Sequence, residues 1–546
     1  MKIKLILLAI SGSLILSANA QQKNPTVNTS LPRPKLVIGL MVDQMRWDYL
    51  YRYYERYGSG GFKRLLKEGF TCENTYINYL PSVTGIGHST VYTGSVPAIH
   101  GIAGNDFIDQ ATGKSMYCAG DSTVSTVGSS SVADGKMSPR NLLVTTMTDE
   151  LRLATNFRSK VIGIALKDRG SILPAGHTAN AAYWYDEGTG NWITSTYYMN
   201  ALPTWVTKFN EQKLSQKYMA QNWNTLYPIN TYVQSTKDDS PYEGKFANAT
   251  APVFPVMTST LNLSMINSTP YGNTLTLDLA KEAIANEALG ADAITDFLAV
   301  SVSSPDYVGH QFGPNSIEVE DTYLRLDRDL ANFFTYVDSK VGKGNYTVFL
   351  TADHGAYNNV NFLTDSKING GLYPATEALR GLNTLLEQQF KVKGLVKSLG
   401  NYQVNLNNPA ITSNKLDVAA IKKTTIDFLK KIQGTLYVID MADVQNATIP
   451  SAYKDQIING YNAERSGVLQ IIPKPGYYSG SRTGTTHGTI SPYDTHIPLV
   501  FMGWGIKQGK SNIPYHMTDI APTISAMLRI QEPNGNIGKP ITEVLK

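Results

Sequence analysis

The sequence predicts an α/β protein, a three-layer αβα sandwich with a mostly parallel central sheet and capping insertions. Five apolar runs have the length and composition of strands that are buried on both faces. Helical patterns lie between these runs, and strands that alternate with helices indicate a parallel sheet covered on both sides. Two long polar regions interrupt the alternation, and we expect them to cap or flank a site.

The first expected strand is "KLVIGLMVD" at residues 35–43, and the helical pattern "YLYRYYERYGSGGFKRLLKEG" follows it. The other four runs have the same form: "KVIGIALKDR" (160–169), "ITDFLAVSVSSPD" (294–306), "YTVFLTADHG" (346–355) and "THIPLVFMGWG" (495–505). The long helical pattern "SIEVEDTYLRLDRDLANFFTYVDSKVG" separates the third run from the fourth.

The composition is that of a large globular protein. The chain has 546 residues, of which 42% are hydrophobic and 17% are charged. We expect one large domain at residues 35–546, because the chain is long enough for a single large domain with insertions. The insertions are expected at about 180–270 and about 357–475, where long apolar runs are few.

The N-terminus has the parts of a secretory signal peptide. Two lysines precede the apolar run "LILLAISGSLIL", and Ala18 and Ala20 occupy the small-residue positions of a cleavage site. We expect a signal peptide at residues 1–20 and a polar leader at residues 21–34, which predicts a periplasmic or secreted protein. No later segment offers about 20 uninterrupted apolar residues, so no stable membrane anchor is expected.

Charge and cysteines limit the partners. The formal charge is +4 and falls to +2 when Lys2 and Lys4 are removed with the signal peptide, so no nucleic-acid partner is expected. Cys72 and Cys118 are the two cysteines, and either one disulfide or two free thiols fits an oxidising compartment. Because no Cys-x-x-Cys pair exists, any metal must be bound by histidines and carboxylates.

Polar residues gather at the ends of the expected strands, where ligands bind in open parallel sheets. They are Asp43, Lys167 with Arg169, Asp306, and Asp353 with His354. One aspartate after a strand is commonly a turn former or a helix cap. Its recurrence on several strands, with histidines nearby, favours a metal site instead.

Two more histidines complete the set. His310 lies four residues after Asp306, which places both side chains on one face of a helical turn. His487 lies in the loop "GTTHGTISPYDTHIP" before the last expected strand. Three aspartates and three histidines suffice for two metal ions with open positions, and nitrogen with carboxylate oxygen suits zinc. The remaining histidines have no obvious carboxylate partner and are expected to pack or to support the ligands: His88, His100, His177, His496 and His516.

Thr84 is the candidate nucleophile. It lies in "NYLPSVTGIGHSTVYTG" at residues 78–94, between a proline-led turn and a helical pattern, so it is also a candidate helix cap. We expect both roles, with Gly85 and Gly87 giving clearance for a phosphate and a metal. Two metals near a hydroxyl serve phosphoryl transfer: one lowers the pKa of the hydroxyl, and the other stabilises the leaving oxygen.

Other catalytic motifs fit less well. A P-loop would need glycine where Ile108 and Trp504 stand before the two "GKS" segments. No G-x-S-x-G elbow is present. A Ser–His–Asp enzyme is compatible with the list of residues, but it leaves the aspartate–histidine set unexplained.

In this order and spacing, the residues resemble those of the alkaline phosphatase superfamily of two-zinc enzymes. Within it, the chain is similar to the PafA-type alkaline phosphatases of flavobacteria over nearly its whole mature length. The segments "VDQMRWDYLYRYY", "GSVPAIHGIAGND", "LKDR", "DYVGH", "FGPNSIEVEDTYLRLDRDLA" and "HIPLVFMGWGIKQG" carry the resemblance. It implies an alkaline-phosphatase-like fold for the catalytic domain at residues 35–546.

The resemblance also implies roles for single residues. Two zinc ions per chain would be bound, one by Asp306, His310 and His487, and the other by Asp43, Asp353, His354 and the Thr84 oxygen. Asn105 in "GIAGND" would hydrogen-bond a non-bridging phosphoryl oxygen. Lys167 and Arg169 would contact the phosphoryl group.

The Lys167–Arg169 pair marks phosphomonoesterases of this type, whereas the related phosphodiesterases lack it. A monoester dianion has one more charge than a diester, so two additional cations favour it in a metal-lined site. Residues two apart on an extended strand end point to the same side, so both can reach one ligand.

The resemblance therefore implies a secreted or periplasmic zinc-dependent alkaline phosphatase. It would hydrolyse small phosphate monoesters through a covalent phosphothreonine at Thr84, and we expect it to be a monomer. A phosphodiesterase or phosphonate esterase is the nearest alternative. A catalytically silent protein that binds carbohydrates or peptides through its Tyr-rich insertions is the alternative from another class.

Overall fold

The computed structural model describes residues 31–247 and 249–546. The expected signal peptide at 1–20, and the part of the expected leader up to residue 30, lie outside the described residues. Residues Arg33–Lys546 form one compact unit. Its main sheet has eleven strands in the order β17-β2-β18-β10-β1-β9-β6-β7-β8-β5, with β19 paired to β2.

The middle of the main sheet is parallel. Its strands are β10 (Tyr346–Thr351), β1 (Leu36–Val42), β9 (Asp296–Val302), β6 (Val161–Ala165) and β7 (Ala181–Asp186). Every residue of these five strands is buried, which is why they appear in the sequence as continuous apolar runs. The expected mostly parallel sheet is therefore confirmed.

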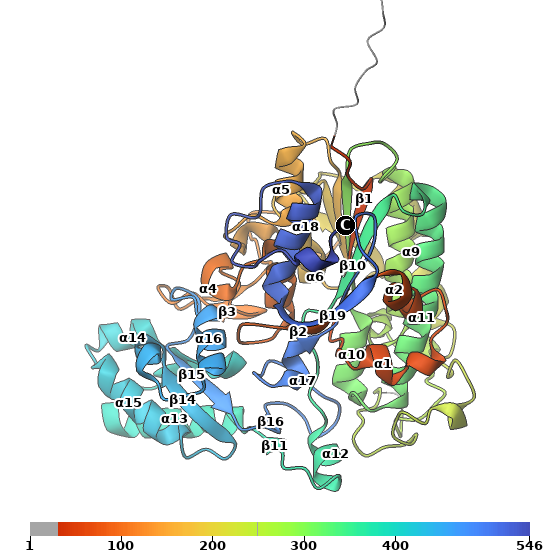
Figure 1. The fold of residues 1–546 in the computed structure, drawn as a ribbon. Coiled ribbons are helices and arrows are strands. Elements are labelled where there is room, and N and C mark those ends of the chain that lie inside the picture. Colours follow the sequence, from red (N-terminus) through yellow and green to blue (C-terminus); the bar gives the residue numbers. More distant parts are fainter. Residues whose placement is uncertain (1–30, 248) are drawn as a thin grey trace, which may run out of the picture. The chain divides into compact units, whose positions relative to one another are not determined.

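Helices form a layer on each side of this sheet (Figure 1). One layer contains α9 (Tyr271–Asn286), which contacts β9, and α11 (Ile317–Val337), which packs on α9. The other contains α5 (Met147–Ala154), α6 (Asp168–Ala175) and α18 (Ile520–Leu528). The predicted three-layer αβα arrangement is confirmed.

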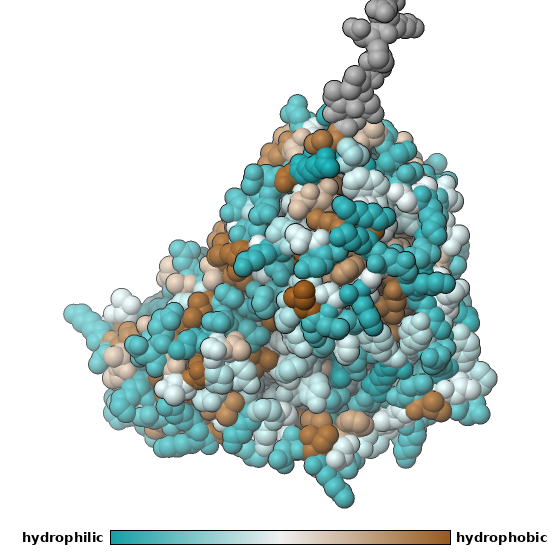
Figure 2. Space-filling model, viewed as in Figure 1, coloured by the Kyte–Doolittle hydropathy of each residue, from teal (hydrophilic) through white to brown (hydrophobic). Residues whose placement is uncertain are grey.

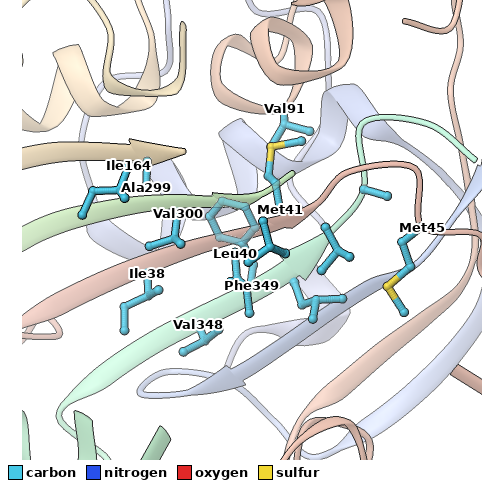
Figure 3. Packing of buried hydrophobic residues seen from close by; sticks show 14 of the residues in the cluster. Ile38, Leu40, Met41, Met45, Val91, Ile164, Ala299, Val300, Val348 and Phe349 are labelled. Atoms are coloured by element: carbon cyan, nitrogen blue, oxygen red, sulfur yellow. The ribbon is translucent and has the colours of Figure 1, made fainter. Parts of the chain in front are cut away.

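The core lies between the layers and the sheet. Figure 3 shows buried side chains of β1, β9 and β10 packed together, with Met41 beside Val91 of helix α3 (Thr84–Thr93). Side chains approach the backbone of β1 closely at Gly39, because a Cβ there would meet the Tyr92 hydroxyl and the Phe349 ring. Helix α3 is thus held directly against the centre of the sheet.

The last expected strand differs from the prediction. Residues 495–505 form two short strands, β17 (His496–Ile497) and β18 (Leu499–Gly503), separated by Pro498, which lacks an N–H for the ladder. β18 runs antiparallel to β10, with Thr351 opposite Leu499. The parallel centre is therefore flanked by antiparallel pairs on this side.

The helical pattern after β1 is also interrupted. It forms α1 (Tyr49–Arg52), a 3₁₀ turn at Tyr54–Arg56 and α2 (Phe62–Glu68). Between them, the Asp327 carboxylate on α11 accepts hydrogen bonds from the N–H groups of Gly58 (2.7 Å) and Phe62 (2.8 Å). The glycines around residue 60 allow this turn, because a Cβ at Gly61 would lie 2.3 Å from the Asp327 carbonyl.

The first polar region begins with strands of the main sheet. β7 and β8 (Asn191–Ser195) pair antiparallel within the range where the insertion was expected from about residue 180. The segments that follow are short helices and 3₁₀ turns up to α9.

The second polar region contains a separate small sheet. Its strands are β12 (Val396–Ser398), β13 (Gln403–Leu406), β15 (Leu469–Pro473) and β14 (Thr435–Asp440), all antiparallel. Helices α13 (Ala375–Phe390) and α15 (Val418–Leu429) pack with it around their own cluster of buried side chains, in light blue at the lower left of Figure 1. We call this unit the small-sheet insertion.

The small-sheet insertion leaves and rejoins the main body at one place. There, β11 (Gly371–Leu372) pairs in parallel with β16 (Tyr477–Tyr478). The face drawn in Figure 2 is mostly hydrophilic, with hydrophobic residues scattered over it. Among the described residues, no helix has the length and apolar character needed to cross a membrane.

Candidate active site

The carboxyl ends of the parallel strands bring the expected residues together. Asp43 follows β1, Lys167 follows β6, Asp353 follows β10, and Asp306 lies in the first turn of α10 (Ser304–Phe312) after β9. All four are buried. The Lys167 ammonium is 2.7 Å from Asp43 Oδ2 and 2.6 Å from Asp306 Oδ2. Lys167 therefore lies between two expected metal ligands.

The first aspartate–histidine group consists of Asp306, His310 and His487. The Nε2 atoms of His310 and His487 are 3.1 Å and 3.7 Å from Asp306 Oδ1. Each histidine uses its Nδ1 for a backbone carbonyl, Thr485 for His310 and Ser82 for His487. These hydrogen bonds aim both Nε2 atoms at the carboxylate, and the three side chains form a group that could hold a metal ion.

The second group is built around His354. Its Nε2 is 3.6 Å from Asp43 Oδ1 and 3.4 Å from Asp353 Oδ2, while its Nδ1 is 3.0 Å from the Gly355 carbonyl. Asp43, Asp306 and His354 have ligand atoms that all lie within 4.8 Å of one another, so Asp306 faces both groups. The His354 and His487 rings are stacked with centroids 3.4 Å apart, which makes the two groups neighbours.

The donor atoms fit divalent metal ions. Asp43 Oδ1 and Asp353 Oδ2 are buried without a hydrogen-bond partner, an arrangement that is costly for anionic oxygens unless a cation is bound. Burial and the Asp43 charge raise the pKa of Asp353, as expected for a buried carboxylate beside a like charge. Burial lowers the pKa of His354 to about 4, so this imidazole is neutral and can act as a ligand.

The other two histidines shift in opposite directions. Burial, with His354 nearby, lowers the pKa of His487 well below its usual value. Burial also opposes protonation of His310, but the Asp306 carboxylate raises its pKa overall. Burial thus favours the neutral, metal-binding form of His487 and His354, whereas the Asp306 carboxylate favours the protonated form of His310.

Thr84 is the first residue of α3, and its side chain is buried. Its Oγ1 is 3.4 Å from His354 Nε2, so the hydroxyl faces the second group. The expected capping role is wrong: Val83 is the N-cap residue, and α3 has no side-chain cap. The hydroxyl faces the candidate metal ligand His354 instead.

The glycines after Thr84 give clearance to protein atoms. A Cβ at Gly87 would lie 2.4 Å from the Asp353 carbonyl, so this glycine lets α3 approach the end of β10. A Cβ at Gly85 would lie 3.0 Å from Cys118 Sγ and 3.2 Å from Asn105 Oδ1. Both glycines therefore give clearance to the site's own backbone and side chains, and clearance for a phosphate and a metal stays a prediction.

The remaining expected residues lie beside these groups. Asn105 Oδ1 accepts a hydrogen bond from the Gly85 N–H at 2.7 Å, which places Asn105 next to Thr84 in the fold. Arg169 and Lys167 line the same cavity of about 230 Å³. Arg169 Nη1 donates to the Tyr117 hydroxyl at 3.2 Å, and its Nε has no hydrogen-bond partner.

The sequence did not predict that Gln44 and His88 contact the carboxylates of the site. Gln44 donates its backbone N–H to Asp353 Oδ1 at 3.1 Å and its amide to Asp306 Oδ1 at 2.6 Å. His88, expected to lack a carboxylate partner, has Nδ1 3.5 Å from Asp353 Oδ2 and also contacts the Thr84 carbonyl. The signal for His88 was its place one helical turn after Thr84.

Two further expectations concern residues outside the two aspartate–histidine groups. His177, also expected without a carboxylate, lies 3.0 Å from Asp149 Oδ2. Cys72 and Cys118 are both buried free thiols, so of the two open alternatives the structure has the reduced one. Burial raises the pKa of each thiol.

Comparison with known proteins identifies the family. A family model described as type I phosphodiesterase / nucleotide pyrophosphatase matches residues 37–498. The chain therefore belongs to this family, within the alkaline phosphatase superfamily. The expected resemblance to PafA-type alkaline phosphatases is confirmed by the relatives described next.

Three relatives match over nearly the full length. Alkaline phosphatase PafA of Elizabethkingia meningoseptica is 52% identical, with 98% of each chain covered. Alkaline phosphatase PhoV of Synechococcus elongatus is 55% identical, with 100% of each covered. A Myroides odoratus protein named calcium-transporting ATPase is 57% identical over 94% of this chain and 95% of its own.

Solved structures give the same relationship. The crystal structure of wild-type PafA superimposes with a TM-score of 0.93 at 53% identity, covering 95% of this chain and 100% of PafA. A PafA variant of known structure is substituted at a threonine, an asparagine, a lysine and an arginine. Those four positions have the residue types and the chain spacing of Thr84, Asn105, Lys167 and Arg169.

Proposed function

We propose that this protein is a secreted or periplasmic, zinc-dependent alkaline phosphatase that hydrolyses small phosphate monoesters through a phosphothreonine at Thr84. One observation carries the proposal: the Thr84 hydroxyl lies 3.4 Å from His354 Nε2, where two aspartate–histidine groups adjoin. The alkaline phosphatase names of PafA and PhoV support it. In this proposal the chain is a monomer, and residues 1–20 are its cleaved signal peptide.

The chemistry follows from residues of this chain. The Thr84 oxygen attacks phosphorus, the bond from phosphorus to the ester oxygen breaks, and the alcohol leaves. Water then attacks the phosphothreonine, which releases phosphate and restores the Thr84 hydroxyl. When bound, two zinc ions would lower the pKa of the attacking hydroxyl and stabilise the charge on the leaving oxygen.

The proposed ligand sets are those that the family resemblance implies. Asp306, His310 and His487 would hold one ion. Asp43, Asp353 and His354, together with the Thr84 oxygen, would hold the other, and the unpartnered oxygens of Asp43 and Asp353 support this assignment.

Lys167 and Arg169 would select the doubly charged phosphoryl group. They line one cavity beside the metal groups, and Asn105 lies next to Thr84 to donate its amide to a phosphoryl oxygen. Two cations in a buried site favour a dianion over the monoanion of a diester. The substitution of the equivalent residue types in a PafA variant supports a functional role for all four.

A Thr84→Ala variant tests the nucleophile. Loss of the hydroxyl is expected to lower kcat/KM for an aryl phosphate by on the order of 10³-fold or more, because no covalent intermediate can form. Thr84→Ser is the matched control, since it keeps a hydroxyl on the same backbone position. Activity of the alanine variant within a few-fold of the parent would remove Thr84 from this role.

The phosphodiesterase in the family's name is the second candidate. Comparing kcat/KM for an aryl phosphate and for its methyl diester decides between a phosphomonoesterase and a phosphodiesterase. A preference for the diester would overturn the role given to Lys167 and Arg169. ATP belongs in the same substrate panel because of the Myroides relative's name. Its terminal phosphoryl group is highly charged, as that of a monoester is, so the proposed site would cleave it as well.

A further inference from the structure

A cavity of about 420 Å³ lies between the metal groups and the small-sheet insertion. On the catalytic side it is lined by Val83, which precedes Thr84, and by Thr486, His487 and Gly488. On the other side it is lined by α13 of the insertion and by the segment Ser398–Tyr402. The cavity thus opens beside an expected metal ligand and is closed by residues that the insertion contributes.

The lining of this cavity is uncharged. Its thirteen residues include no aspartate, glutamate, lysine or arginine. The lining contains one histidine, His487, whose Nε2 faces Asp306. The cavity around Arg169 is the opposite, because it contains Lys167, Asp168 and Glu187. Charge is therefore concentrated where a phosphoryl group would bind and is absent from the larger cavity.

The segment Ser398–Tyr402 is held in an unusual conformation. Asn401 and Tyr402 have φ angles of 57° and 59°, a left-handed conformation that is uncommon for two successive non-glycine residues. The Tyr402 hydroxyl accepts a hydrogen bond from the Ser479 N–H at 2.8 Å, which fixes the segment against the opposite wall. Such a conformation persists where the surrounding structure requires a particular side-chain position.

Asn401 is the side chain that this conformation positions. Its amide nitrogen would lie 2.6 Å from a Cβ at Gly104, so it reaches over the residue before Asn105. Among the described residues, the Asn401 amide makes no hydrogen bond within the protein, although it lines the cavity. It is therefore available to a ligand whose phosphoryl group lies by Thr84 and Asn105.

We infer that this cavity receives the alcohol part of the substrate and selects uncharged alcohols that carry a ring. We call it the leaving-group cavity, and the inference rests on the proposed function. Its volume lies within the roughly 300–1,000 Å³ typical of small-molecule sites, which gives room for a sugar or an aryl ring. The leucines and Tyr402 contact the ring, and Asn401 hydrogen-bonds a hydroxyl or carbonyl on it.

The absence of charge in the lining explains the selection. A carboxylate or ammonium on the alcohol would lose water on entering the cavity and would meet no opposite charge there. Uncharged polar groups lose less and can pair with Asn401, Ser398 or Thr376. Alcohols of equal acidity are therefore expected to differ in kcat/KM according to their charge.

The first experiment uses the unmodified enzyme. Three aryl phosphates are compared, with uncharged, carboxylate-bearing and ammonium-bearing alcohols matched in pKa. The uncharged substrate is expected to have a kcat/KM about tenfold higher than either charged one. Equal values for all three would overturn the inference while leaving the proposed function intact. Hydrolysis of none of them would instead refute the proposed function.

The second experiment places a charge in the cavity. Asn401→Asp is expected to raise the ratio of kcat/KM for the ammonium substrate over the carboxylate substrate by about tenfold. Asn401→Gly, which keeps the left-handed backbone without strain, is expected to lower kcat/KM for the uncharged substrate and to leave that ratio unchanged. Inhibition by inorganic phosphate is expected to change less than threefold in Asn401→Gly, because phosphate occupies only the Thr84 end.

Lys391→Gly is the matched control. Lys391 is an exposed residue of the same insertion with a φ of 58°, so this change tests the backbone effect away from the cavity. It is expected to leave all three kcat/KM values unchanged. If Asn401→Asp folds and the ratio of kcat/KM for the ammonium substrate over the carboxylate substrate is unchanged, Asn401 does not face the alcohol. If that variant does not fold, the comparison of the three substrates with the unmodified enzyme decides the inference.

Discussion

The guanidinium of Arg169 is held by Tyr117, and Tyr117 is held in turn by Asp168. The Tyr117 hydroxyl accepts a hydrogen bond from Arg169 Nη1 and donates one to Asp168 Oδ1 at 2.5 Å. Burial and the Asp168 charge raise the pKa of Tyr117, so it remains a donor at all working pH values. Tyr117 is thus a positioning residue for Arg169.

Replacing Tyr117 by phenylalanine removes this hydroxyl and keeps the ring. We expect kcat/KM for a monoester to fall by about tenfold, the value of one well-aligned hydrogen bond to a charged group, with a smaller effect on a diester. Kinetics of Tyr117→Phe, Arg169→Ala and the double variant provide the check. If the hydroxyl acts through Arg169, the two losses are not additive; additive losses would contradict the positioning role.

Sequence reasoning identified the residues that end strands and missed those whose place depends on backbone detail. Asp43, Asp306 and Asp353 follow long apolar runs, so a strand-end argument finds them. Gln44 contacts two of these carboxylates because its backbone has a φ of 63°, which no sequence pattern indicates. Tyr117 reaches Arg169 only through the tertiary fold.

Helix α5 and the loop after α6 are joined by one ion pair. Asp149 belongs to the capping box of α5 with Thr146, and it also contacts His177 Nδ1 at 3.0 Å. His177 Nε2 is 2.9 Å from the Leu142 carbonyl, so the ring bridges both sides of the helix start. Burial opposes the charge on His177, but Asp149 raises its pKa above the usual 6.5.

This pair predicts a pH-dependent stability. Because the pKa of His177 is raised in the folded state, its contribution is complete below about pH 6.5 and is lost as pH rises through the folded pKa. The pKa of Asp149 is lowered against the effect of burial, so its contribution is lost only in acid. His177→Gln is expected to lower Tm by about 1 °C at pH 5.5, for roughly 1 kcal/mol in a chain of this size, and by less at pH 8.5. Thermal unfolding at both values checks this, and an equal decrease at both contradicts it.

At the level of elements, the sequence predicted strands better than their directions. Runs buried on both faces, such as 35–43 and 294–306, are unambiguous because every side chain must be apolar. The same kind of run at 495–505 gives an antiparallel strand, since direction depends on how the connecting loop returns to the sheet. The helix expected after β1 is broken because Asp327, far along the chain, binds the turn.

In the whole molecule, a metal ion held by the candidate aspartates and histidines would connect metal binding to folding. Asp43 and Asp353 end two neighbours of the parallel centre, and each has a buried oxygen without a partner. A metal ion bound only by the folded chain stabilises it in proportion to the logarithm of its concentration over Kd. Stability and activity should therefore respond together to metal removal.

Chelation is expected to abolish phosphatase activity and to lower Tm, with zinc restoring both. A site filled at 1,000 times its Kd contributes about 4 kcal/mol to folding. Thermal unfolding, with metal content measured on the same samples, checks this. The Thr84→Ala variant separates the effects, because it should show the decrease in Tm without activity to lose. A Tm that chelation leaves unchanged would contradict metal binding by these residues.

The paired strands β11 and β16 have a consequence for how such proteins diversify. The chain leaves the main body at Gly371–Leu372 and returns beside it at Tyr477–Tyr478. An inserted unit with adjacent ends behaves as a cassette, because it can be exchanged without separating the points where it is attached. Transplanting residues 373–476 from a relative would replace one wall of the leaving-group cavity and leave every candidate metal ligand in its own polypeptide context. Evolution can thus change substrate range here without altering the chemistry at phosphorus.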